Sequence, residues 1–102
     1  MITRSDLEPG YQAVQSGHAA IQYVFEHPEC AKNWFENSNY LGFLSVTNEQ
    51  ELISLTEMAA EKDIKFSIFR EPDIDNQITA IALEPGNKSK KLCSSLKLAL
   101  SI

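Results

Sequence analysis

Four polar side chains of uncommon type follow one another on the segment PGYQAVQSGHAAIQY, namely Tyr11, Gln15, His18 and Gln22. Their spacings of four, three and four residues place them along one edge of a helix. A histidine transfers protons near neutral pH, and a glutamine donates and accepts hydrogen bonds, so that it can hold a water or a carbonyl group. We call these four residues the polar ridge. One function that such a ridge can perform is chemistry on a carbonyl compound.

A structural role for the polar ridge explains the same residues without any chemistry. In that role His18 fills a polar gap between a helix and a sheet, and Tyr11 only packs. Small residues lie beside the ridge and allow a ligand or another backbone to approach closely: Ala13, Gly17, Ala19 and Ala20. The residues alone leave both interpretations open.

The helix that must carry the ridge is predicted over residues 11–26. Its apolar face is expected at positions spaced by three and four residues: Val14, Gly17, Ile21, Val24 and Phe25. The polar ridge flanks this face, so its side chains are expected to be half-buried and to need hydrogen-bond partners there.

Further helices and strands alternate along the rest of the chain. A second helix is predicted over 28–38, a strand over 40–46, and a third helix after Asn48, where Glu51 approximates a capping box. Strands are predicted over 64–69 and 77–83, and a short helix follows Pro85 and Gly86, with a strand-like or irregular tail after it. The strand over 77–83 is nearly all apolar, which favours a central place in its sheet. Together with a short first strand, this order predicts one α/β domain over residues 1–102, a three-layer sandwich with a mixed, roughly four-stranded sheet covered by helices.

Composition limits the classes of protein that remain. The chain has 102 residues, 43% of them hydrophobic and 23% charged, and a formal net charge of -5. We expect no membrane span and no signal peptide, and two isolated cysteines favour a reducing, cytoplasmic location. Four basic residues concentrate near the C-terminus, namely Lys88, Lys90, Lys91 and Lys97. They form either a solvated helix face or a binding surface for an anion.

Two further segments have alternative interpretations. The acidic stretch EPDID, with Glu71, Asp73 and Asp75, is either a solvated turn or a weak site for a hard cation. Trp34 either packs the second helix or stacks on a nucleic-acid base. We expect no metal and no cofactor.

The segment RSDL followed by GYQAVQSGHAA resembles the first strand and helix of the type II peptidyl-tRNA hydrolases, which carry R-x-D-L and then G-K-x-A-A-Q-x-x-H-A. The segments IFREPD and TAIALEP are similar to that family's strand before D-A-G and to its T-V-L-A-I-G-P strand. The resemblance implies cleavage of the ester between a peptide and the terminal ribose of tRNA. It also implies a mixed four-stranded sheet and, often, a homodimer.

The resemblance implies a set of site residues. It implies that His18, Glu71 and Thr79 are catalytic, and that Tyr11, Gln15, Gln22 and Asp73 bind the substrate, peptidyl-tRNA or the tRNA 3′ end. Glu71 stands at the family's aspartate, and Tyr11 stands at the family's lysine. A tyrosine donates one neutral hydrogen bond where the lysine supplies a charge. The alternative to a hydrolase is therefore a non-catalytic module on the same scaffold that binds a tRNA end, a small ligand or a protein, or one that mainly self-associates.

Overall fold

The computed structural model describes residues 1–101. The elements follow one another as β1 (Ile2–Arg4), α1 (Pro9–Glu26), α2 (Pro28–Glu36), β2 (Leu44–Val46), α3 (Glu49–Glu61), β3 (Phe66–Glu71), a 3₁₀ turn (Pro72–Ile74), β4 (Gln77–Leu83), α4 (Asn87–Leu92) and β5 (Lys97–Leu98). The order matches the one predicted from the sequence, with β5 added.

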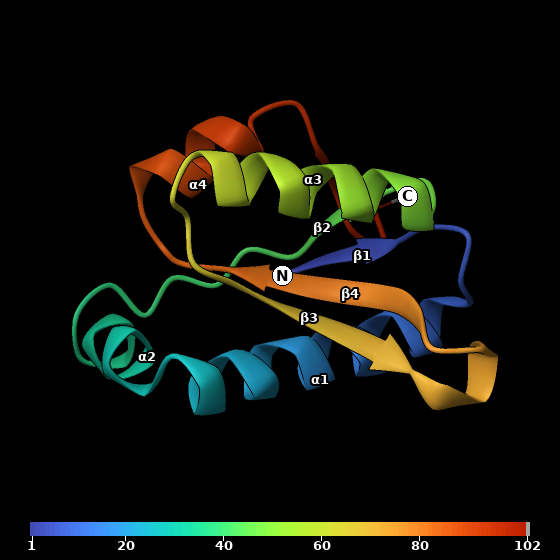
Figure 1. The fold of residues 1–102 in the computed structure, drawn as a ribbon, viewed down its shortest axis with the longest axis horizontal. Coiled ribbons are helices and arrows are strands. Elements are labelled where there is room, and N and C mark those ends of the chain that lie inside the picture. Colours follow the sequence, from blue (N-terminus) through green and yellow to red (C-terminus); the bar gives the residue numbers. More distant parts are fainter. Residues whose placement is uncertain (102) are drawn as a thin grey trace.

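The strands form one mixed sheet in the order β3-β4-β1-β2-β5. β1 and β2 are parallel, and every other neighbouring pair is antiparallel. Helices α1 and α2 cover one face of the sheet, and α3 and α4 cover the other (Figure 1). The predicted three-layer α/β sandwich is confirmed. The sheet has five strands and not four, because the two residues of β5 pair with the edge of β2.

Local signals explain where the helices begin. Pro9 and Pro28 stand in the first turns of α1 and α2, where the missing N–H of proline costs nothing. Asn48 caps α3 by accepting a hydrogen bond from the backbone N–H of Glu51 at 3.0 Å. The Glu51 carboxylate in turn accepts hydrogen bonds from the N–H and the hydroxyl of Thr47. The predicted cap is confirmed, although the glutamate reaches one residue further back than in a capping box.

Apolar side chains form a core on each side of the sheet. Between the sheet and α3 the buried residues are large, namely Ile2, Val46, Leu52, Leu55, Ile78 and Ile81. Between the sheet and α1 they are mostly small, namely Ala19, Tyr23, Ala31, Ala80 and Ala82. β4 contributes to both cores, which confirms its predicted interior place in the sheet.

The predicted apolar face of α1 is wrong. Val14, Ile21 and Phe25 are exposed by 57, 59 and 80%, whereas the buried face of α1 consists of Gln12, Gln15, Ser16, Ala19 and Tyr23. The sheet beneath α1 offers a threonine and two alanines and therefore little apolar volume. The helix accordingly turns its small and hydrogen-bonding side chains inward.

Candidate functional site

A β-bulge in β4 prepares the site. Phe69 of β3 pairs with Ala80, but the next residue, Arg70, pairs with Ile78, so Thr79 has no partner across the strand pair. Such an extra residue changes the alternation of side chains beyond it. Ile78 and Ile81 both belong to the core beneath α3, whereas Ala80 lies in the core beneath α1. The bulge therefore lets Thr79 point at α1 next to Ala80.

A hydrogen-bonded chain connects three elements at this point. The Thr79 hydroxyl donates to Gln15 Oε1 at 2.7 Å, and Gln15 Nε2 donates to Glu71 Oε1 at 3.0 Å. Thr79 and Gln15 are 0 and 1% exposed, while Glu71, at the end of β3, is only partly buried. The Thr79 carbonyl accepts a hydrogen bond from the Thr3 hydroxyl at 2.9 Å, which ties this chain to β1. The arrangement fixes one carboxylate at the open end of a buried polar chain.

Tyr11 lies beside this carboxylate. The pKa of Tyr11 is raised, first by desolvation and then by the charge of Glu71, a hydrogen bond to Glu71 and the charge of Asp73. The phenol therefore stays protonated and neutral at physiological pH. The backbone N–H of Asp73 points at Glu71 Oε2 over 3.5 Å. Tyr11, Gln15, Glu71 and Thr79 thus come together from α1, β3 and β4.

His18 and Gln22 lie further along the polar ridge. The exposed His18 ring stacks on Phe69, with ring centroids 4.6 Å apart and planes inclined by 8°. Gln22 Nε2 donates to the Ile68 carbonyl at 2.9 Å and to the Glu26 carboxylate at 3.0 Å. Both side chains fasten α1 to β3 and not to the Thr79–Gln15–Glu71 chain. The predicted ridge is therefore divided between a polar chain and a helix–strand contact.

Arg4 and Asp6 form a second polar cluster that pattern reasoning did not single out. The Arg4 guanidinium binds Asp6 through Nε at 3.0 Å and Nη2 at 2.9 Å. Its Nη1 donates to Gln77 Oε1 at 2.8 Å and to the Ile78 carbonyl at 3.1 Å. This contact holds the first two residues of β4 just before the bulge. The R-x-D spacing was the available signal, because it places both charges at one strand end.

Other candidate groups stay outside the site. Trp34 donates its indole N–H to the Tyr40 carbonyl, and Lys90 Nζ lies 5.9 Å from the Tyr40 ring centroid. Within residues 1–101 no three His, Cys, Asp or Glu side chains are grouped so that they could hold a metal ion. In the same part of the chain, no helix has both the length and the apolar content that crossing a membrane requires.

Two comparisons with known proteins match nearly the whole chain. The family model described as "Peptidyl-tRNA hydrolase PTH2" matches residues 1–99 of the chain. A curated protein of Staphylothermus marinus named "Peptidyl-tRNA hydrolase" is 30% identical over 110 residues, which cover 96% of this chain and 91% of that protein.

Proposed function

Because the chain belongs to the PTH2 family of peptidyl-tRNA hydrolases, we propose that it hydrolyses the ester between a peptide and the terminal ribose of tRNA. The observation that carries this proposal is the Thr79–Gln15–Glu71 chain, which holds a carboxylate at a partly open position beside a phenol. The family membership and the site chemistry support the same reaction class. The alternative of a non-catalytic module is not favoured.

In this proposal Glu71 is the general base. Its carboxylate takes a proton from a water molecule while the water oxygen forms a bond to the ester carbonyl carbon. The bond between that carbon and the ribose oxygen then breaks, and Glu71 returns the proton to the ribose oxygen. The products are the free peptide acid and the tRNA with its terminal hydroxyl. This sequence balances atoms and protons with water as the only co-reactant.

Gln15 and Thr79 are positioning residues in this proposal. They are too deeply buried to contact a substrate, but Gln15 donates to Glu71, and Thr79 donates to Gln15. The Gln15 donor on Oε1 fixes the plane of the carboxylate, and Oε2, at which the Asp73 N–H points from 3.5 Å, keeps a second lone pair for water. A misplacement of about 1 Å at a reacting group lowers a rate by about 10²-fold, so this orientation matters for catalysis.

Tyr11 takes the place of a cation in this proposal. Its phenol is held protonated by a hydrogen bond to Glu71, and once Glu71 has taken the proton of the water, the single phenol O–H turns to the oxygen that becomes negative as the carbonyl is attacked. His18 and Gln22 keep α1 on β3, and Asp73 holds Glu71 through its backbone N–H. Direct contacts of these three side chains with the substrate remain predictions from the resemblance.

The test is hydrolysis of N-acetyl-aminoacyl-tRNA by the purified chain in ¹⁸O-labelled water. We expect one labelled oxygen in the released N-acetyl amino acid and none in the tRNA, because the proposed attack is on the carbonyl carbon. Turnover that needs a phosphodiester break, or no turnover at any tested protein concentration, contradicts the proposal.

We further propose that the chain is a cytoplasmic homodimer. Its substrate arises where translation occurs, and the outward face of α1 carries Val14, Ile21, Val24 and Phe25, each exposed by 46% or more. An exposed apolar face of this kind is typical of an interface. Light scattering after size exclusion tests it: we expect twice the 11.4 kDa chain mass, and the monomer mass for Phe25→Asp. A wild-type monomer contradicts the homodimer.

A further inference from the structure

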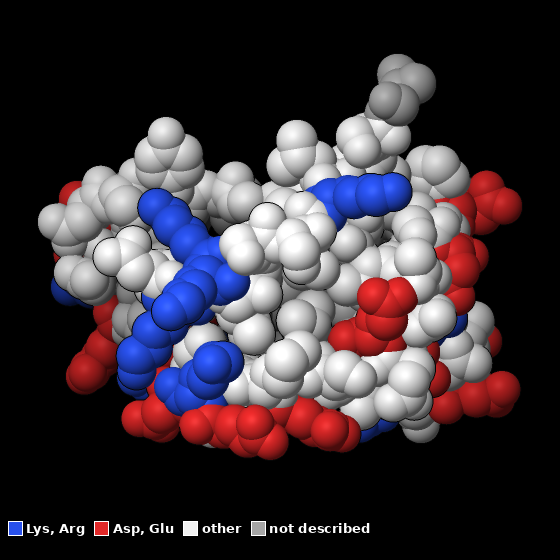
Figure 2. All heavy atoms as spheres, turned by 90° about the horizontal axis from the view of Figure 1, so that it is seen from above, with Lys and Arg blue, Asp and Glu red and all other residues white. Residues whose placement is uncertain are grey.

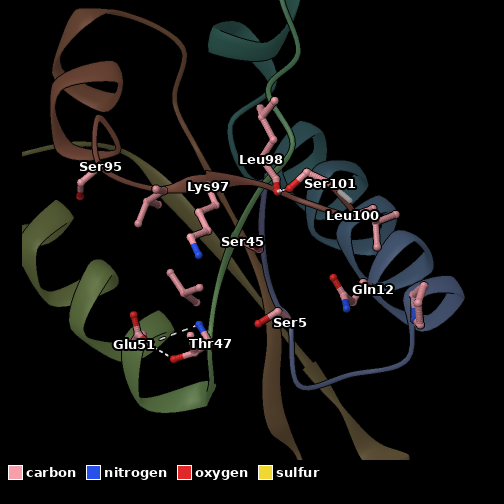
Figure 3. A pocket seen from close by; sticks show the side chains of 13 residues that line it. Ser5, Gln12, Ser45, Thr47, Glu51, Ser95, Lys97, Leu98, Leu100 and Ser101 are labelled. Carbon is pink, nitrogen blue, oxygen red and sulfur yellow. Dashed lines mark hydrogen bonds between the residues drawn. The ribbon is translucent and has the colours of Figure 1, made fainter.

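A groove of ≈ 620 Å³ lies at the carboxyl ends of the parallel strands β1 and β2 (Figure 3). Ser5 follows β1, Thr47 follows β2, and the first turns of α1 and α3 form two of its sides. The segment 95–101, attached to β2 through β5, closes it. Ligands of open α/β sheets bind outside the carboxyl ends of parallel strands, which is the position of this groove.

The lining of the groove combines one cation, hydroxyl groups and apolar surface. The Lys97 ammonium points into the groove, and Ser5 and Ser45 lie on the same strand ends (Figure 3). Within residues 1–101 the single salt bridge joins Arg4 to Asp6, so Lys97 has no carboxylate partner there. The apolar part of the lining comes mainly from three leucines of the C-terminal segment: Leu96, Leu98 and Leu100.

These groups are distributed as a nucleotide requires. The Lys97 ammonium suits a phosphate, and the leucines offer apolar surface against which the face of a base can pack. Glu51, at the α3 side, is the carboxylate of the groove, and Thr47 holds it in place. A fixed carboxylate accepts hydrogen bonds from ribose hydroxyls, as an acidic residue does in dinucleotide-binding folds. A hydrogen bond from the ribose 2′-hydroxyl to this carboxylate would also let the groove distinguish RNA from DNA.

The groove lies next to the proposed site. Gln12 lines it, while the preceding residue, Tyr11, lies beside Glu71 on the other side of the same helical turn. β1 and β3 are both antiparallel to β4, so the groove and Glu71 lie at the same edge of the sheet, with the start of β4 between them.

We infer that this groove binds a nucleotide of the single-stranded CCA end of tRNA, immediately before the terminal adenosine. This inference rests on the proposed function, because it is the ester on the terminal ribose that then reaches Glu71. A second cavity of ≈ 650 Å³, lined by Trp34, Tyr40 and Lys90, lies beside Met1 and Leu83 at the other end of the sheet from Glu71, which pairs with the first residue of β4. On the side of the molecule that α3 and α4 cover, Lys and Arg side chains gather toward one end, and acidic side chains follow the adjoining long edge (Figure 2).

The test is binding of the RNA trinucleotide CCA to the full chain, followed by amide chemical shifts and by titration calorimetry. We expect shifts at Ser5, Ser45 and Lys97, and weaker binding of the deoxy trinucleotide. Lys97→Ala should lower the CCA affinity about tenfold, as expected for a charge-assisted contact, and reduce the salt slope by about one. The matched control is Lys91→Ala on α4, for which we expect no change.

Hydrolysis kinetics of groove variants test the nucleotide site independently of the proposed hydrolase activity. Lys97→Ala should raise KM for N-acetyl-aminoacyl-tRNA about tenfold and leave kcat within about twofold. Ser5→Leu, which fills the groove, should act in the same way. Shifts at the groove in a protein that hydrolyses nothing support the nucleotide site and reject the hydrolase. Shifts located elsewhere, or equal CCA affinity and KM for Lys97→Ala and wild type, overturn the nucleotide site.

Discussion

The buried hydrogen bond between Gln15 and Thr79 makes a quantitative prediction about stability. Gln15→Met keeps the length of the side chain but removes the acceptor of the Thr79 hydroxyl and the donor to Glu71. A buried neutral hydrogen bond contributes about 1 kcal/mol, and one to a charged group about 1.5–3 kcal/mol. Because Glu71 is partly exposed, we use the lower end for that bond. We therefore expect Gln15→Met to lower the free energy of unfolding by about 2–3 kcal/mol.

Thr79→Val should cost about 1–3 kcal/mol, because it leaves Gln15 Oε1 buried without its donor. The double variant removes both partners of the bond at once, so its cost should be smaller than the sum of the two single costs. We expect a coupling energy of about 1–2 kcal/mol between the two positions. Urea unfolding of the four proteins, extrapolated linearly to water, measures it.

Gln12 provides the matched control for this cycle. It is a second buried glutamine on α1, 5% exposed, and its amide donates to the Leu7 carbonyl at 2.6 Å. Gln12→Met combined with Thr79→Val should be additive within about 0.5 kcal/mol, since the two side chains share no partner. A Gln15–Thr79 coupling below about 0.5 kcal/mol, or an equal coupling in the control pair, refutes the polar chain.

Three further predictions follow from single side chains. At a protein concentration at which size exclusion shows only monomers, Phe25→Ser should change the free energy of unfolding by less than about 0.5 kcal/mol, because Phe25 is 80% exposed; a loss of about 3 kcal/mol in urea unfolding under these conditions would place Phe25 in the core instead. Arg4→Lys should cost about 2–3 kcal/mol by the same measurement, since a lysine cannot bind Asp6 through two nitrogens and also reach Gln77, and a neutral outcome contradicts that role. Burial raises the pKa of Tyr23, and so does its hydrogen bond to Cys30. The phenol of the unfolded chain ionises near pH 10, whereas that of the folded chain stays protonated. The free energy of unfolding should therefore fall above pH 10 by about 1.4 kcal/mol per pH unit for this group. Tyr23→Phe should remove that part of the slope in unfolding measured between pH 9 and pH 11, and an unchanged slope contradicts the assignment.

Elements with strong local signals were predictable from the sequence. α3 has a capping asparagine followed by a regular apolar stripe, and β4 is a continuous apolar run between turn residues. Both were found close to the expected bounds. The tail after α4 was expected to be strand-like or irregular, and its local sequence did not decide between the two, because the two residues of β5 gain their only pairing from the edge of β2. The expected strand over 40–46 shortens to Leu44–Val46 for a similar reason, since pairing with β1 starts at Leu44.

The orientation of α1 shows where periodicity stops being informative. The spacing of Val14, Ile21, Val24 and Phe25 defines one apolar face, but it does not tell whether the sheet or another surface covers that face. Which face of α1 packs on the sheet depends on residues far away in the chain. Thr79 and two alanines of β4 lie opposite α1, and small or hydrogen-bonding side chains of α1 fit against them. A half-buried ridge was expected, yet Gln15 is fully buried and His18 is exposed.

The composition of the candidate site was accessible mainly through the family resemblance. Gln15 and Glu71 are 56 residues apart, and nothing in their local sequence predicts a contact between them. The bulge that turns Thr79 toward α1 is also invisible locally, since β4 is apolar on both sides of it. The Arg4–Asp6 pair was visible as a spacing, but its role in holding the start of β4 requires the coordinates.

The proposed general base can be tested most directly by comparing two charge-neutralising variants of the same acidic segment. Glu71→Gln removes the carboxylate that the polar chain positions, whereas Asp75→Asn removes an equal charge at a left-handed turn position that asparagine tolerates. With N-acetyl-aminoacyl-tRNA as substrate, we predict that kcat falls about 10²–10⁴-fold for Glu71→Gln and stays near the wild-type value for Asp75→Asn. Equal kcat values for the two variants would contradict the account.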